Sequence, residues 1–151
     1  MLRVSAVVSS SELDPARIID HVRLDATDRH RRRVVLVGEE GATYLLNFSE
    51  PRQLRDGDGL VLESGEIVRV AGRPEALIEV SAADAPSLAR LAWHIGNRHT
   101  DVQIMGDTLR IRRDHVLEEM LRGLGATLTP IEAAFDPEPG AYAGHGHSGK
   151  R

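Results

Sequence analysis

The N-terminal half of the chain has the pattern of short strands separated by turns. Runs rich in β-branched and other apolar residues occur at residues 2–8, 34–37, 43–48, 60–62 and 67–70. Glycine-containing turns lie between several of these runs, and the turn at residues 38–41 gives its two neighbours the form of a β-hairpin. No helical period is evident before residue 80. The pattern predicts a small all-β domain over residues 1–72.

After Pro74 the pattern changes to strands that alternate with amphipathic helices. Strands are predicted at residues 76–80, 102–105, 109–112 and 126–131. The first helix begins after Asp84, a typical N-cap residue, and Gly96-Asn97 is expected to end it. Asp114 caps the second helix in the same way. The order strand, helix, strand, strand, helix, strand predicts an α+β, ferredoxin-like βαββαβ domain over residues 75–135.

The end of the chain is rich in proline, glycine and histidine. Residues 136–151 contain too few apolar side chains to form a packed core, so they are predicted to be a flexible tail. The tail contains the pair His145 and His147, separated by one glycine.

Composition excludes several classes of protein. With no Cys, the chain has no disulfide, no Cys-based zinc finger and no cysteine nucleophile. No apolar run is long enough to span a membrane, and the N-terminus lacks a signal-peptide pattern, so a cytoplasmic protein is expected. The net charge of −4 argues against a nucleic-acid partner. Phosphate-binding glycine loops and common hydrolase motifs are missing from the sequence, which predicts a protein that is not an enzyme.

Histidine supplies the best candidate metal ligands, because neutral imidazole suits nickel, copper and zinc. His99 follows the first predicted helix and is either a ligand or an ordinary loop residue. His115 opens the second helix, where the helix dipole favours the neutral ring, although a solvated surface histidine has the same pattern. His145 and His147 could close onto a metal ion that is held elsewhere.

One basic run stands out in the β domain. Residues 28–33 read Asp-Arg-His-Arg-Arg-Arg. Such a run indicates either a solvated strand edge or a contact for an acidic partner such as an acidic protein surface.

The chain resembles the UreE family of urease accessory proteins, which are nickel metallochaperones. The most specific match is Trp-His-Ile-Gly-Asn-Arg-His at residues 93–99, which is similar to the family signature His-Leu-Gly-Asn-Arg-His. Leu-Arg-Asp-Gly-Asp at residues 54–58 and Asp-His-Val-Leu at residues 114–117 extend the resemblance. Phe-Asp-Pro-Glu-Pro-Gly-Ala-Tyr at residues 135–142 carries it almost to the end of the chain.

The resemblance implies a two-domain protomer. Its β domain would be similar to the peptide-binding domains of Hsp40-type chaperones, and its ferredoxin-like domain would form a homodimer and bind metal. Members deliver Ni(II) to apo-urease together with a UreG-type GTPase and the urease accessory complex.

The resemblance also implies which residues bind the metal. His99 matches the interface ligand that each subunit contributes, and His145 and His147 in the tail would complete the site. His115 would be an auxiliary ligand, although Arg113 stands where some members have a second histidine. Cu(II) or Zn(II) would compete with Ni(II) for such ligands.

Two other functions compete with this one. A peptide-binding or RNA-binding adaptor without metal would fit the two-domain organisation, but only 3% of the residues are aromatic and available to stack on bases. A metal-dependent hydrolase is disfavoured, because histidines and carboxylates do not cluster within a short stretch.

Overall fold

A computed structural model of the 151-residue chain describes residues 1–140. The chain forms two compact units, one built from Met1–Arg73 with the described residues from Pro139 onward, and the other from Pro74–Glu138. In the described residues, no helix has both the length and the apolar character needed to cross a membrane.

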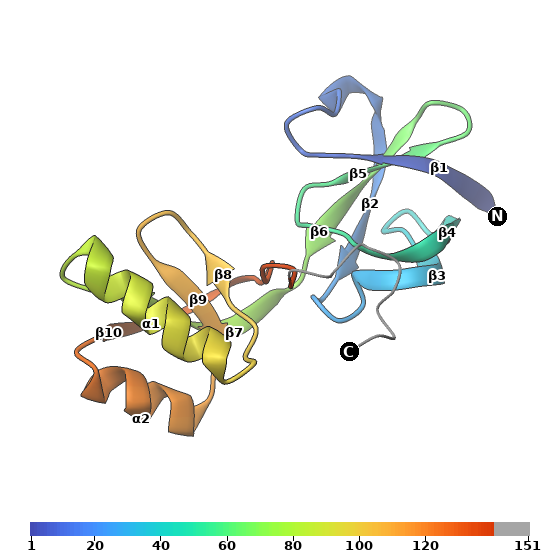
Figure 1. Ribbon diagram of the computed structural model, residues 1–151. Helices are drawn as coiled ribbons and strands as arrows, with labels where there is room; N and C mark the ends of the chain where they lie inside the picture. The colour runs from blue at the N-terminus through green and yellow to red at the C-terminus, as the bar shows by residue number, and fades with distance from the viewer. Residues whose placement is uncertain (141–151) are drawn as a thin grey trace. The chain divides into compact units, whose positions relative to one another are not determined.

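The first unit is a six-stranded sheet (Figure 1). Its strands are β1 (Leu2–Val8), β2 (Ile18–Leu24), β3 (His30–Val37), β4 (Thr43–Gln53), β5 (Gly59–Leu62) and β6 (Ile67–Gly72), with a short 3-10 turn at Pro15–Arg17. Their order in the sheet is β2-β6-β5-β1-β4-β3, so β2 and β3 are the edge strands. β3 and β4 pair antiparallel, which confirms the predicted hairpin. β2 was not predicted.

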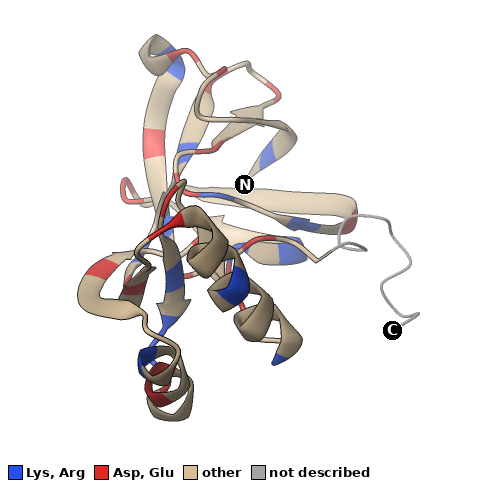
Figure 2. Cartoon of the chain, turned by 60° about the vertical axis from the view of Figure 1, so that its left-hand side comes forward, with Lys and Arg blue, Asp and Glu red and all other residues tan. Residues whose placement is uncertain are grey.

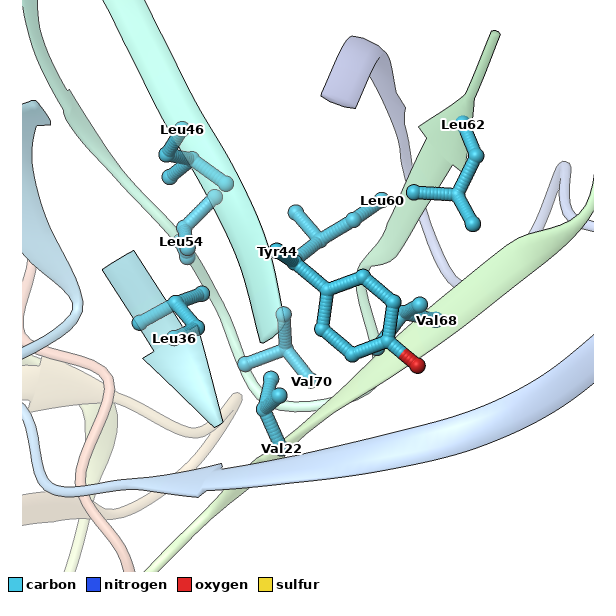
Figure 3. Close-up of a cluster of buried hydrophobic side chains, with 9 residues drawn as sticks. All are labelled: Val22, Leu36, Tyr44, Leu46, Leu54, Leu60, Leu62, Val68 and Val70. Atoms are coloured by element: carbon cyan, nitrogen blue, oxygen red, sulfur yellow. The ribbon is translucent and has the colours of Figure 1, made fainter. Parts of the chain in front are cut away.

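The core of the first unit is almost entirely aliphatic (Figure 3). Its buried members are Val22, Leu36, Tyr44, Leu46, Leu54, Leu60, Leu62, Val68 and Val70. Tyr44 is the one aromatic residue among them, and its ring lies within the cluster while its hydroxyl is directed to the edge of it (Figure 3).

That hydroxyl is paired with a buried carboxylate. Tyr44 Oη donates to Asp20 Oδ2 at 2.6 Å, and the backbone amides of His21 and Glu40 donate to Asp20 Oδ1 at 2.7 and 3.2 Å. Burial acts to raise the pKa of Asp20, but these hydrogen bonds outweigh it and leave that pKa below its usual value. The Asp20 cluster, as we call Asp20 with Tyr44 and the two amides, therefore ties β2 to β4 and to the turn that follows β3.

Stability of the first unit is expected to fall at high pH because of Tyr44. Burial, helped by the Asp20 hydrogen bond and charge, raises the pKa of Tyr44 to about 12. An unfolded tyrosine ionises near pH 10, so the unfolded state gains charge first and stability is lost as the pH rises from about 10 through 12, by up to about 1.4 kcal/mol per pH unit. Urea unfolding at pH 9 and pH 11.5 measures this loss. Tyr44→Phe should remove most of the pH dependence in this window, and an unchanged slope in that variant would contradict the assignment.

The second unit places two helices on one face of a four-stranded antiparallel sheet (Figure 1). The elements are β7 (Pro74–Ser81), α1 (Ala85–Asn97), β8 (Gln103–Ile104), β9 (Leu109–Arg112), α2 (His115–Gly123) and β10 (Thr127–Ala134). The strand order is β10-β7-β9-β8. The six elements occur in the predicted order along the chain.

Both helices begin as their sequences predicted. The Asp84 carboxylate accepts from the amide of Ser87 at 2.8 Å, and the Asp114 carboxylate accepts from the amide of Leu117 at 3.0 Å. Each cap satisfies one of the amides that a helix start leaves without an intrahelical partner. The helices and sheet enclose a second aliphatic core of Ile78, Val80, Leu91, Ile95, Leu109, Ile111, Leu117 and Leu121.

After β10 the chain does not leave the unit at once. Residues 135–138, here called the C-terminal strap, begin with Phe135, which is fully buried beneath the Arg112 guanidinium at 4.6 Å from the ring centre. The Asp136 amide donates to Gln103 Oε1 at 3.0 Å, and the Glu138 amide donates to the Val102 carbonyl at 2.7 Å. The sequence assigned residues 136–138 to a flexible tail. They are held instead because the edge of β8 offers backbone groups that need hydrogen-bond partners.

Candidate metal site at the end of helix α1

His99 lies immediately after α1 in an unusual backbone conformation. Among residues 1–140 it is the one residue other than glycine with a positive φ, at 58°. Its amide donates to the Gly96 carbonyl at 3.0 Å, and the amide of Thr100 donates to the Ile95 carbonyl at 3.4 Å. These two bonds define a Schellman motif, in which the position occupied by His99 is usually glycine.

The helix ends at the pair Gly96-Asn97, as the sequence predicted. Both residues are still helical, and the cap is Arg98. Glycine tolerates helical backbone at a modest cost, so the hydrogen bonds and not the glycine decide where the helix stops. The consequence is that a histidine takes the left-handed position.

A left-handed conformation costs an L-residue about 1 kcal/mol or more relative to glycine, although histidine is among the types found there most often. Strained backbone of this kind concentrates at functional sites, where the side chain is needed for something besides stability. The His99 side chain is exposed to solvent, so its imidazole is accessible to a ligand or a partner.

The helix that leads to His99 has an exposed face with little charge. Arg90 is the single residue of α1 with a full charge, as Figure 2 shows by the mostly uncoloured helix. Trp93 is 63% exposed, and its ring packs edge-on against His94 at a centroid distance of 5.1 Å. A tryptophan this exposed, on a helix face whose one charged residue is Arg90, is typical of a protein–protein contact.

His115 is exposed at the first position of α2. Glu118, the acidic residue in the first turn of α2, is already engaged: Arg113 Nε and Nη2 donate to its two carboxylate oxygens at 3.1 and 3.2 Å, and the Asp114 amide donates to the same carboxylate at 2.9 Å. The hydrogen bonds from Arg113 lead the effects that hold the pKa of Glu118 below its usual value, against the opposing effect of burial. Arg113 thus serves a structural ion pair at the position where some relatives were expected to have a histidine ligand.

No three histidine or acidic side chains come together as a metal site within residues 1–140. His99 and His115 both lie within these residues, and neither belongs to such a group of three. The predicted tail ligands His145 and His147 lie outside the described residues.

The Arg-rich run of the first unit divides into two parts. Arg29 is fully buried, and its guanidinium donates to the carbonyls of Leu54 at 3.1 Å and Asp25 at 3.3 Å. By contrast, the three arginines at residues 31–33 are exposed on the edge strand β3. Their exposure agrees with the interpretation of this run as a solvated strand edge. The sequence pattern did not distinguish Arg29 from its neighbours, because its partners come from distant segments.

A cavity of about 490 Å³ lies at the same end of β3 and β4. It is lined by His30, Phe48, Ser49, Glu50, Pro51, Arg52, Gln53 and Pro139. Arg52 lies over the Phe48 ring at 5.7 Å from its centre. No motif in the sequence pointed to this hollow, which depends on the register of the hairpin.

Comparison with known proteins gives a consistent result over the whole chain. Residues 7–72 match the family profile "UreE urease accessory protein, N-terminal domain", and residues 75–151 match the corresponding C-terminal domain. Urease accessory protein UreE of Bradyrhizobium sp. strain BTAi1 is 49% identical over 148 residues, which cover 98% of this chain and 71% of the relative. The protein of the same name from Chelativorans sp. strain BNC1 is 46% identical over 149 residues, which cover 99% of this chain and 92% of the relative.

Proposed function

This chain belongs to the UreE family of urease accessory proteins, and from that membership and the geometry at His99 we propose that it is a nickel metallochaperone. It would carry Ni(II) as cargo and deliver it to apo-urease during urease maturation. The relatives are named as accessory proteins and not as enzymes, in keeping with a role in binding and transfer.

The observation that carries the proposal is the strained, exposed His99. An imidazole held at a position where glycine is more stable indicates a side chain selected for what it binds. One imidazole is too little to hold a divalent metal tightly, but a two-fold axis doubles every ligand. His99 from each subunit of a homodimer would therefore supply two nitrogens to one ion, with His145 and His147 as supplementary ligands.

The face of α1 supports the homodimer. Trp93 lies six residues before His99 on the helix that ends at the site, and its exposed ring would be covered by a second copy of the chain. An isologous contact centred on α1 would bring the two His99 side chains near the two-fold axis. His115 lies on the other helix and would at most be an auxiliary ligand.

The finer fold assignments support the same role. The βαββαβ order and the strand order β10-β7-β9-β8 support assigning the second unit to the ferredoxin-like class, and we propose that this unit binds the metal. We assign the first unit to the Hsp40-type peptide-binding class. The exposed arginines at residues 31–33 would suit an acidic surface on a partner, and a UreG-type GTPase and the apo-urease complex are the proposed partners.

Nickel titration tests the proposal directly. Calorimetry on the purified protein should show about one tight Ni(II) per dimer, with light scattering reporting the dimer. A chain that ends after Tyr142 should bind nickel more weakly, because it lacks His145 and His147. Cu(II) and Zn(II) should compete, since imidazole sites bind them as well. A monomer that binds no nickel below millimolar concentration would contradict the carrier role.

An adaptor that binds a peptide without metal is the second candidate. It is favoured by the 490 Å³ cavity and the arginine-bearing edge of β3, neither of which involves His99. Absence of nickel binding, together with saturable binding of an acidic peptide that is lost on changing Arg31 and Arg33 to Glu, would favour this function over the first.

A further inference from the structure

Three basic side chains form a row along α1 and its cap. Arg90, His94 and Arg98 follow one another at intervals of four residues. Residues four apart lie on the same side of a helix, about 6 Å apart along its axis. We call these three residues the basic row. The row ends one residue before His99, so it leads along the helix to the candidate metal ligand.

The basic row faces the groove between α1 and α2, which lie next to each other on the sheet (Figure 1). Arg90 and His94 line a cavity of about 120 Å³ together with Leu124, the C-cap of α2. Arg98 Nη1 donates to the thioether of Met120, also in α2, at 3.9 Å. The cavity is completed by Ser87 and the buried Leu91. It therefore combines two leucines with a hydroxyl group and two basic groups.

The two arginines of the basic row differ from the other arginines of the second unit. The other four each lie within 4.0 Å of a carboxylate: Arg110, Arg112, Arg113 and Arg122. Among the described residues, neither Arg90 nor Arg98 takes part in such an ion pair. Asp84 interacts with the charge of Arg90, but its carboxylate caps α1. The groove thus presents positive charge that no carboxylate of the described chain neutralises at contact distance.

We propose that the basic row is a docking site for an acidic segment of a partner protein, which lies along the groove between α1 and α2. The inference rests on the proposed function and deepens it, because a partner bound along the row is brought next to His99, from which it receives the metal. Complementary charge of this kind speeds encounter and fixes orientation more than it adds affinity. Those are the properties that a transfer between two proteins requires.

Spacing and size favour an extended segment with carboxylates on alternate residues. Side chains on one face of an extended chain recur at about 6.6–6.8 Å, close to the spacing of about 6 Å along the basic row. A cavity of about 120 Å³ takes one side chain, whereas sites for small-molecule ligands usually measure about 300–1,000 Å³. Guanidinium groups can in addition bind both oxygens of a carboxylate.

The basic row and the proposed homodimer contact are centred on different sides of α1. Successive residues of a helix turn by about 100°, so Trp93 is directed about 100° away from His94, the middle member of the row. A second copy of the chain that covers Trp93 would leave the groove between α1 and α2 open to another protein.

The test measures binding of a fluorescent peptide in which glutamate alternates with serine, by anisotropy with the full chain. The control peptide has glutamine in place of glutamate. Arg90→Glu reverses the charge of an exposed residue that makes no ion pair, and Arg90→Lys keeps that charge. Arg31→Glu is the matched control, because it makes the same change of charge at an exposed position of the first unit.

Arg90→Glu should raise the Kd for the acidic peptide by about 5-fold to 10-fold, and Arg90→Lys and Arg31→Glu should leave it within about 2-fold. Binding of the parent should weaken as sodium chloride is raised from 0.1 M to 1 M, since the screening length falls from about 10 Å to about 3 Å. Nickel affinity of Arg90→Glu should stay within about 2-fold of the parent, because Arg90 lies about 13 Å along the helix axis from residue 99.

Three results would overturn the inference. Equal binding of the glutamine peptide would show that carboxylates are not what the row recognises. Weaker binding in Arg31→Glu but not in Arg90→Glu would assign acidic segments to the edge of β3. Displacement of the peptide by micromolar inorganic phosphate would assign the row to phosphate groups. Nickel titration of the parent keeps the two proposals apart: tight nickel binding without peptide binding contradicts the docking site alone, and peptide binding without nickel binding contradicts the carrier role alone.

Discussion

A His99→Gly variant is expected to lose tight nickel binding and, at the same time, to unfold at a higher temperature than the parent. Loss of the imidazole removes the main ligand from both subunits at once, and an increase in Kd of at least about 100-fold corresponds to about 3 kcal/mol of binding energy. The gain in stability has a separate cause. Glycine accepts the φ of 58° without a Cβ clash, and this should add about 0.5–1 kcal/mol after the extra freedom of the unfolded chain is counted.

His99→Ala is the matched control. Alanine lacks the ligand but keeps the Cβ, so nickel binding should fall equally while the melting temperature does not rise. Both variants should remain dimers, because the proposed contact involves Trp93 and not the metal alone. Scanning calorimetry of metal-free protein gives the stabilities. Tight nickel binding by either variant would reject His99 as the main ligand. A lower melting temperature for His99→Gly than for His99→Ala would contradict the claim that the positive φ at residue 99 destabilises residues that carry a Cβ.

Gly38→Ala is expected to destabilise the first unit by about 3 kcal/mol or more, which is a large effect for the addition of one methyl group. A Cβ at Gly38 would lie 1.9 Å from Asp20 Oδ2, so the carboxylate would have to move. Movement would break its hydrogen bonds with Tyr44 and two amides and leave polar groups buried without partners. Urea unfolding measured by circular dichroism reports the loss.

Gly41 provides the control in the same turn. It has open space around its Cβ position and a φ of 92°, a conformation that Asn tolerates better than most residues. Gly41→Asn should therefore change stability by less than about 1 kcal/mol. Nickel affinity should be unaffected in both variants under native conditions, since His99 belongs to the other unit. Equal stabilities of Gly38→Ala and the parent would show that the Asp20 cluster can rearrange freely.

The helix starts and most strands could be predicted because their signals are local. Asp84 and Asp114 cap helices by accepting hydrogen bonds from amides three positions later, so both partners lie within one short stretch of sequence. β2 was missed for the opposite reason. Its Asp20 breaks the apolar pattern of a buried strand. The hydrogen bonds that stabilise the buried carboxylate come from Tyr44 and Glu40, which are twenty or more residues away in the sequence.

The candidate site was predictable in outline but not in geometry. The motif at residues 93–99 marked His99 as the candidate, and the structure places it directly after α1. That His99 adopts a left-handed conformation depends on two hydrogen bonds to carbonyls of the helix, which no residue pattern specified. The strap was hidden in the same way, because Glu138 is held through backbone groups of residues 102 and 104.

The backbone at residue 99 also limits which metals the proposed site could come to prefer by mutation. Besides glycine, the residue types that adopt positive φ most readily are Asn, Asp and His, whose donor atoms are oxygen and nitrogen. Replacing His99 by Cys or Met would favour soft ions such as Cu(I), but it would place at this helix end a residue type that adopts positive φ less readily. Replacing His99 by Asp, whose oxygen ligands suit harder ions, keeps a residue type that tolerates positive φ. Mutation at this position can therefore shift the metal preference toward harder ions more easily than toward softer ones.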